Sequence, residues 1–140
     1  MKKFVRVLCF ALVAVMLCAS LVACGGPAKD PADAKAALDE NGYTTTKDDT
    51  ITPGILSALG YKCDSVVTGT KTVEDDEGNK SIEHVSIYYF TNEENAEKAL
   101  NKVKEYAGEK KNDEETNWVD ATLSGSMIYF GTEQAIKDAK

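Results

Sequence analysis

Apolar residues follow three patterns along this chain, and each pattern predicts a different kind of segment. A positive start at Lys2, Lys3 and Arg6 precedes an uncharged run, 7–23, that is rich in Val, Leu and Ala. Further along, some segments have apolar residues every three or four positions, which is typical of an amphipathic helix. Elsewhere Val, Thr and aromatic residues follow one another closely, which is typical of a strand. The first pattern stays near the N-terminus, and the other two alternate through the rest of the chain.

Helical spacing and helix-start signals predict four helices after residue 30. Asp30 precedes a proline, and so does Thr52, which places a capping side chain just before a residue suited to the first helical turn. Thr91 and Glu94 have the spacing of a capping box. The predicted ranges are 31–41, 53–59, 92–107 and 133–139, with N-caps at Asp30, Thr52, Thr91 and Thr132. Glycine closes the first three helices.

Strand patterns predict an antiparallel sheet. The expected strands are 43–47, 63–73, 82–90, 118–123 and 127–130, with turns at 75–79 and 124–125. The segments YFTNEENAEKA (89–99) and YFGTEQAIKDA (129–139) align without a gap, and each follows a hairpin and opens a helix. They indicate two β-β-α units in tandem. The likeness of the two segments is explained either by duplication or by coincidence, since strand ends favour aromatics and helix starts favour Glu.

These elements predict the fold class. We expect an α+β domain with one mostly antiparallel sheet of four or five strands and helices packed chiefly on one face. A chain of 140 residues suits a single domain. The first segment is set apart from it, because a positive start followed by an apolar run describes a secretory signal peptide.

The end of the apolar run carries a more specific signal. Leu21-Val22-Ala23-Cys24 is followed by Gly-Gly-Pro, which stops a helix or a membrane span. The four residues resemble the lipobox of bacterial lipoproteins. The resemblance implies that Cys24 carries a diacylglyceryl group and that residues 1–23 are removed. The alternative is an uncleaved signal anchor, which we disfavour because an anchor needs no cysteine at its outer end.

The resemblance implies a domain organisation and a location. Residues 24–30 become a flexible tether that spans at most about 20–25 Å, and residues 31–140 form the α+β domain. Two acyl chains hold a protein stably on a bilayer, whereas one binds only marginally. We therefore expect a lipid-anchored protein on the extracytoplasmic face of the cell membrane. Its expected partners are that membrane and an unknown protein, peptide or glycan.

Charge excludes one class of partner. Removal of residues 1–23 takes three of the 16 basic residues and none of the 23 acidic ones, which leaves a formal net charge of −10. Nucleic-acid binding needs a basic footprint, so we expect no nucleic-acid partner. The acidity itself favours solubility and identifies no ligand.

Residues with catalytic or metal-binding chemistry are few. Without the signal segment and the lipidated cysteine, Cys63 is the only thiol and His84 the only imidazole. Cys63 is interpreted as a small buried side chain, with a reactive thiol as the alternative. The acidic turn at 75–79 has Val73 and His84 where a calcium loop needs acids, so it is interpreted as a solvated turn. We expect no cofactor, no metal site and no catalytic residue.

An aromatic group is the remaining candidate site. Alternation places His84 and Tyr88 on one face of their strand, and Trp118 lies on the more polar side of its own. Together they are a hypothetical binding face on the outside of the sheet. The alternative is that a loop or the first helix covers them.

Three functions remain open at this point. We favour a non-catalytic binding or accessory module at the cell surface. The second is a lipid-anchored enzyme with an unrecognised site, for which Cys63 and His84 are the candidates. The third is a small solute-binding component, which is disfavoured because about 110 folded residues do not readily form two lobes around a ligand.

Overall fold

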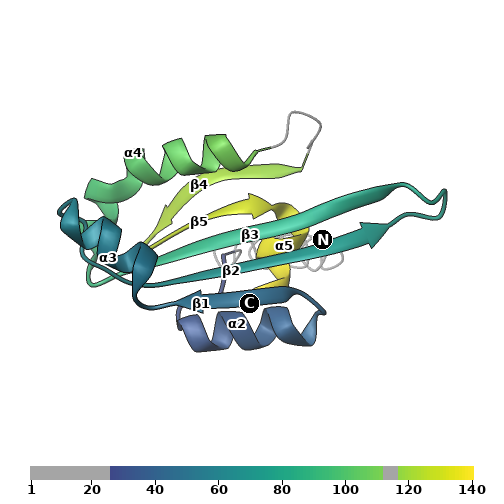
Figure 1. Cartoon of the computed structure of the whole chain (residues 1–140), viewed down its shortest axis with the longest axis horizontal. Helices are drawn as coiled ribbons and strands as arrows, with labels where there is room; N and C mark the ends of the chain where they lie inside the picture. The colour runs from purple at the N-terminus through teal and green to yellow at the C-terminus, as the bar shows by residue number, and fades with distance from the viewer. Residues whose placement is uncertain (1–25, 112–116) are drawn as a thin grey trace, which may run out of the picture.

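The computed structural model describes residues 26–111 and 117–140, so the predicted signal peptide and Cys24 lie outside the described residues. Figure 1 shows helices packed around one twisted sheet. The helices are α2 (Pro31–Glu40), α3 (Ile51–Ala58), α4 (Glu93–Lys110) and α5 (Glu133–Asp138). The strands are β1 (Thr44–Asp48), β2 (Cys63–Glu74), β3 (Lys80–Phe90), β4 (Trp118–Ser124) and β5 (Met127–Thr132).

The strands form one sheet in the order β1-β2-β3-β5-β4, and each neighbouring pair is antiparallel. This confirms the predicted α+β class. β2 and β3 are longer than their neighbours: β1 pairs with β2 only as far as Thr70, and β5 pairs with β3 only from Val85 onward. Beyond those points the two strands project from the body as a ribbon that ends in the turn at 75–79 (Figure 1).

Helices cover both faces of the sheet, and the prediction that they lie chiefly on one face was wrong. α3 and α4 share one buried cluster with the sheet, the α3/α4 cluster, and α2 and α5 share another, the α2/α5 cluster. In β3 the residues Tyr88 and Phe90 enter the first cluster, whereas Val85, Ile87 and Tyr89 enter the second. A strand that is apolar on both faces needs a covering layer on each side.

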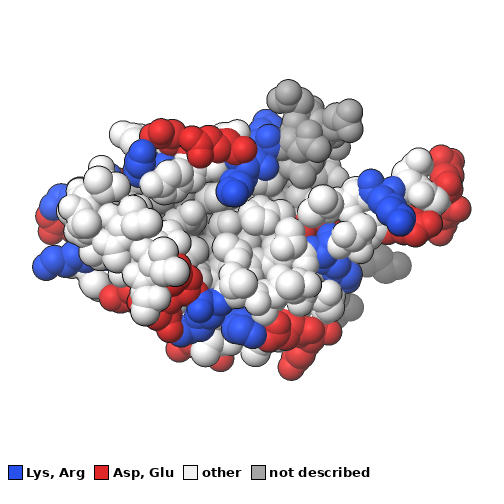
Figure 2. Space-filling view, viewed as in Figure 1, with Lys and Arg blue, Asp and Glu red and all other residues white. Residues whose placement is uncertain are grey.

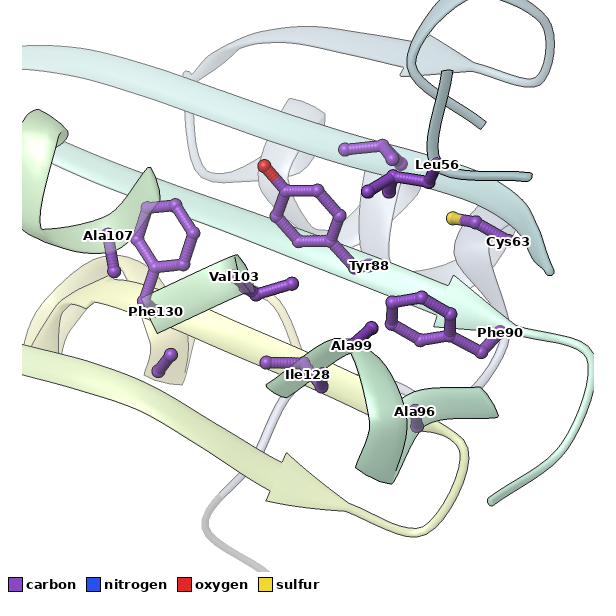
Figure 3. Packing of buried hydrophobic residues seen from close by; sticks show 12 residues of the cluster. Leu56, Cys63, Tyr88, Phe90, Ala96, Ala99, Val103, Ala107, Ile128 and Phe130 are labelled. Atoms are coloured by element: carbon purple, nitrogen blue, oxygen red, sulfur yellow. The ribbon is translucent and has the colours of Figure 1, made fainter. Parts of the chain in front are cut away.

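The α3/α4 cluster joins large side chains from the sheet to small ones from the helix. Tyr88, Phe90 and Phe130 project from β3 and β5 toward α4 (Figure 3). Three alanines and one valine face them from α4: Ala96, Ala99, Val103 and Ala107. Their spacing of three and four residues forms a narrow apolar stripe, which brings the helix backbone close to the aromatic rings.

The α2/α5 cluster includes the start of the described chain. The Ala28 N–H donates to the Ala139 carbonyl over 2.8 Å, and the Tyr89 hydroxyl donates to the Ala28 carbonyl over 2.8 Å. Pro27 is buried, and Gly26 lies against the ring of Tyr129. Residues 26–30 are therefore packed on the domain as an N-terminal strap, and the prediction of a flexible tether over 24–30 does not hold for them.

The two β-β-α units share their order of elements but not their packing. α4 begins at Glu93 and α5 at Glu133, the equivalent positions of the aligned segments, yet the two helices lie on opposite faces. Gly131 precedes α5 with a φ of +146°, and a Cβ there would lie 2.1 Å from the His84 carbonyl oxygen. Thr91 holds the equivalent position before α4. The second unit therefore requires glycine where the first accepts a side chain.

Helix starts agree with the predictions only in part. Asp30 caps α2 as expected, since its carboxylate accepts the Ala32 N–H at 2.8 Å. α4 is capped by Asn92, whose side chain accepts the Asn95 N–H, so the predicted capping box of Thr91 was wrong. Thr132 directs its hydroxyl to the Glu83 carboxylate and makes no side-chain cap bond to α5. α4 also continues past its predicted end at Gly108 to Lys110.

Candidate functional site

Exposed apolar side chains concentrate on one helix. In the described ranges, 26–111 and 117–140, the large apolar residues that are exposed are Ile51 (72%), Ile55 (55%), Leu59 (55%) and Ile82 (57%). Ile51 and Ile55 belong to α3, and Leu59 is its C-cap residue. We call these three residues the α3 surface. Scattered exposed apolar residues are ordinary, but a contiguous set indicates an interaction site.

Their spacing places the three side chains in one row. Residues four and eight positions apart lie on the same side of a helix, so Ile51, Ile55 and Leu59 follow one another along α3. The opposite side of α3 is apolar as well, because Pro53 and Leu56 are buried against the sheet. Figure 2 shows the end of the molecule that carries α3 as a largely uncharged surface with charged side chains at its edges. α3 is thus apolar on both sides but covered on only one.

Specific hydrogen bonds hold α3 in this position. The Asp48 carboxylate accepts the backbone N–H groups of Ile51 at 2.9 Å and Thr52 at 2.8 Å. These bonds hold the pKa of Asp48 well below its usual range. At the other end, Gly60 has a φ of +93° and the Tyr61 N–H donates to the Leu56 carbonyl at 2.9 Å. Both helix ends are satisfied, so the exposed row belongs to a well-defined helix.

Desolvation of the α3 surface removes no charge from water. α3 contains no Asp, Glu, Lys or Arg, and its sequence is ITPGILSA. Asp49, just before the helix, is already paired with Lys47 at 2.7 Å. Burying a charged group is costly unless it is paired. A partner that covers the α3 surface therefore buries apolar area without that penalty.

The predicted aromatic residues lie on the sheet face that α4 covers, and they are buried to different extents. His84 and Trp118 stack with ring centroids 6.3 Å apart and an interplanar angle of 4°, and Phe130 lies against both rings. Tyr88 belongs to the same face, as predicted, but only 7% of it is exposed. α4 packs on this face of the sheet and Tyr88 is buried beneath it, whereas His84 and Trp118 are half-buried. Burial lowers the pKa of His84.

The structure separates the two residues proposed for catalysis. Cys63 pairs with Phe90 in the sheet, whereas His84 lies six residues before Phe90 in β3. That spacing corresponds to about 20 Å along a strand. Burial also raises the pKa of the Cys63 thiol to about 11, which disfavours the reactive thiolate. Cys63 and His84 therefore do not share one site.

The described part of the chain has two small hollows on its surface. One, of about 220 Å³, is lined by Lys29, Glu93 and the β4–β5 turn. The other, of about 210 Å³, is lined by Val119, Tyr129, Ile136 and two charged residues of α5. Both are smaller than the roughly 300–1,000 Å³ of a typical small-molecule pocket. No group of three His, Cys, Asp or Glu side chains suited to a metal ion occurs among the described residues.

The helices within 26–111 and 117–140 are all too short or too polar to cross a bilayer. Comparisons with protein-family models, curated proteins and solved structures found no match to this chain.

Sequence reasoning missed the α3 surface, although the signal was present. Ile51, Ile55 and Leu59 have helical spacing, and Leu56 falls on the other side of the same helix. A short helix that is apolar on both sides is covered on both sides or exposes one of them.

Proposed function

We propose that this protein is a cell-envelope lipoprotein that is anchored through Cys24 and acts as a non-catalytic binding module. We further propose that the α3 surface is its contact site for a partner protein. The exposed row of Ile51, Ile55 and Leu59 carries this proposal, because it is a contiguous apolar surface on a fixed helix.

A protein partner fits the α3 surface better than a lipid surface. Anionic headgroups attract Lys and Arg, and α3 contains neither. The chain without residues 1–23 has a formal net charge of −10, which such a membrane repels. The chain also enters the domain at Gly26 on the α2/α5 side, opposite α3. A partner with an apolar face that docks on α3 meets none of these obstacles.

The row alone is smaller than a complete interface. Stable complexes bury about 800 Å² on each partner, far more than three aliphatic side chains provide. The α3 surface therefore suits the central anchor of an interface whose rim includes polar neighbours such as Lys62 and Asp64. A second copy of this chain offers only the same small row, so a different protein is the expected occupant.

The lipid anchor is tested by processing and fractionation. Wild-type protein made in its bacterial host should partition into the detergent phase, and its N-terminal peptide should begin at Cys24 and carry the mass of a diacylglyceryl group. Cys24→Ser should abolish both. Cys63→Ser is the matched control and should leave both unchanged. A free thiol at Cys24, or a mature chain that begins before it, contradicts the anchor.

The binding role is tested by the size of the solubilised protein. Wild type in mild detergent should migrate as an assembly larger than one chain, and Ile55→Asn should shift it to the size of one chain. Ile82→Asn is the control, because Ile82 is equally exposed but lies on the β2–β3 ribbon. An assembly with the mass of two copies, or one that survives Ile55→Asn, contradicts the proposal.

A further inference from the structure

The N-terminal strap crosses one face of the domain and is held at several points. Tyr89 donates its hydroxyl to the Ala28 carbonyl, and Ala28 donates its N–H to the Ala139 carbonyl, each over 2.8 Å. Ala28 packs against the α2/α5 cluster, and Pro27 is buried. Asp30 then caps α2. The chain is thus fixed to the α2/α5 side from Gly26 onward.

Little chain remains between this fixed point and the proposed lipid. Cys24 precedes Gly26 by two residues, and two residues span at most about 7 Å. A free tether over residues 24–30 spans up to about 20–25 Å, enough for the domain to turn over above the membrane. With the strap packed, a bilayer that holds lipid on Cys24 must lie close to Gly26.

We propose that the N-terminal strap sets the orientation of the domain, with the α2/α5 side against the bilayer that holds the lipid on Cys24 and the α3 surface directed away from it. This inference rests on the proposed anchor at Cys24. Gly26 lies against Tyr129, on the side of the sheet opposite the α3/α4 cluster. The strap thus presents the α3 surface to proteins beyond the membrane.

The two helices of the α2/α5 side carry a small net negative charge. Lys35 in α2 pairs with Asp39 at 2.7 Å, and Lys137 lies in α5, but the two helices also hold Asp33, Glu40, Glu133 and Asp138. Such a surface has no attraction to an anionic bilayer. The short connection to the lipid, and not charge attraction, therefore determines which side faces the membrane.

The experiment measures the distance of two sites from the bilayer. The lipidated protein is reconstituted into phosphatidylcholine vesicles that contain a fluorescent acceptor lipid. A donor dye is attached in place of Lys137 on α5 or Lys104 on α4, which are both exposed lysines on opposite sides of the sheet. We expect a larger loss of donor fluorescence at position 137 than at position 104.

The control lengthens the connection and leaves the domain unchanged. A Gly-Ser linker of about ten residues inserted before Gly26 adds a reach of about 16–19 Å. It should abolish the difference between the two dyes. Tyr89→Phe, which removes the bond to Ala28, should reduce the difference, whereas Tyr43→Phe, which removes a bond to Asp138, should not. Equal losses in the uninterrupted chain, or a difference that survives the linker, overturn the proposal.

Failure of the anchor gives a distinct result. Protein without a native lipid does not associate with the vesicle bilayer, and this result contradicts the proposed function. The strap is then tested by coupling a maleimide lipid to the Cys24 thiol of residues 24–140, where Cys63 is buried. A larger loss at position 137 in this lipid-coupled protein supports the strap, and equal losses overturn it.

Discussion

Helices α3 and α4 cover the same face of the sheet, but α4 exposes charged side chains to solvent and α3 exposes apolar ones. α4 buries its alanines and Val103 and exposes charged side chains, including the pair Lys98–Glu94 at 2.7 Å. α3 buries Leu56 and Pro53 and exposes a row of Ile and Leu. The packing of the domain covers the apolar stripe of α4. Of the five apolar residues within α3, it buries two, Pro53 and Leu56.

The difference separates residues that stabilise the fold from residues that are free for function. Full burial of an Ile or Leu side chain contributes about 1.5–3 kcal/mol. At Ile51, Ile55 and Leu59 much of this contribution is not realised in the isolated domain, because more than half of each residue is exposed. A partner that covers the row gains this free energy of burial when it binds.

The largest difference in stability between the buried and the exposed side of α3 is expected at Leu56. Leu56→Ala removes a side chain that is 1% exposed between α3 and the sheet, and we expect a loss of about 2–5 kcal/mol in the free energy of unfolding. Ile55→Ala, the adjacent position on the exposed side, should change it by less than about 0.5 kcal/mol. Urea denaturation of the soluble domain measures both. Equal losses would mean that α3 packs differently.

The close approach of α4 is tested next. Ala99 is fully buried among aromatic side chains, so Ala99→Leu should cost about 1–3 kcal/mol through overpacking. Lys98→Leu, at the exposed neighbouring position, is the control and should be nearly neutral. Thermal unfolding measures both variants. A stabilised Ala99→Leu variant would show spare room beneath α4.

The smallest effect concerns the start of α3 and depends on pH. The backbone bonds that Asp48 accepts lower its pKa in the folded state, so its contribution to stability is present above the unfolded pKa of about 3.9. That contribution decreases as pH falls through the unfolded pKa toward the lower folded one. Asp48→Asn should therefore be less stable than wild type at pH 7, and the difference should shrink below about pH 4. A difference in the free energy of unfolding between Asp48→Asn and wild type that stays constant with pH contradicts the assignment.

Local signals in the sequence predicted the elements, and contacts between distant residues decided the rest. Asp30 caps α2 through an N–H two residues away, which a reader of the sequence can foresee. The bond from Tyr89 to Ala28 joins residues 61 positions apart, so a segment that looks like a free tether is fixed instead.

The candidate sites, like the fold, depend partly on contacts between residues that are distant in the sequence. Apolar residues on both faces of Val85–Phe90 were a signal for two covering layers, and the prediction of helices chiefly on one face overlooked it. Trp118, Tyr88 and His84 were correctly placed on one face. Tyr88 is buried because α4 packs on that face, and no local pattern sets the side of the sheet on which α4 lies. The location of Cys24 on the membrane stays a prediction from the sequence.

The most direct test of the central claim compares two equally exposed isoleucines. A photoreactive amino acid at Ile55 or at Ile82 is activated in intact cells that produce the protein. We predict a discrete adduct between this chain and one other protein from position 55, lost when Ile51→Asn is added, and no such adduct from position 82. Equal adducts from both positions, or adducts from position 55 with lipid or with a second copy of this chain, would contradict it.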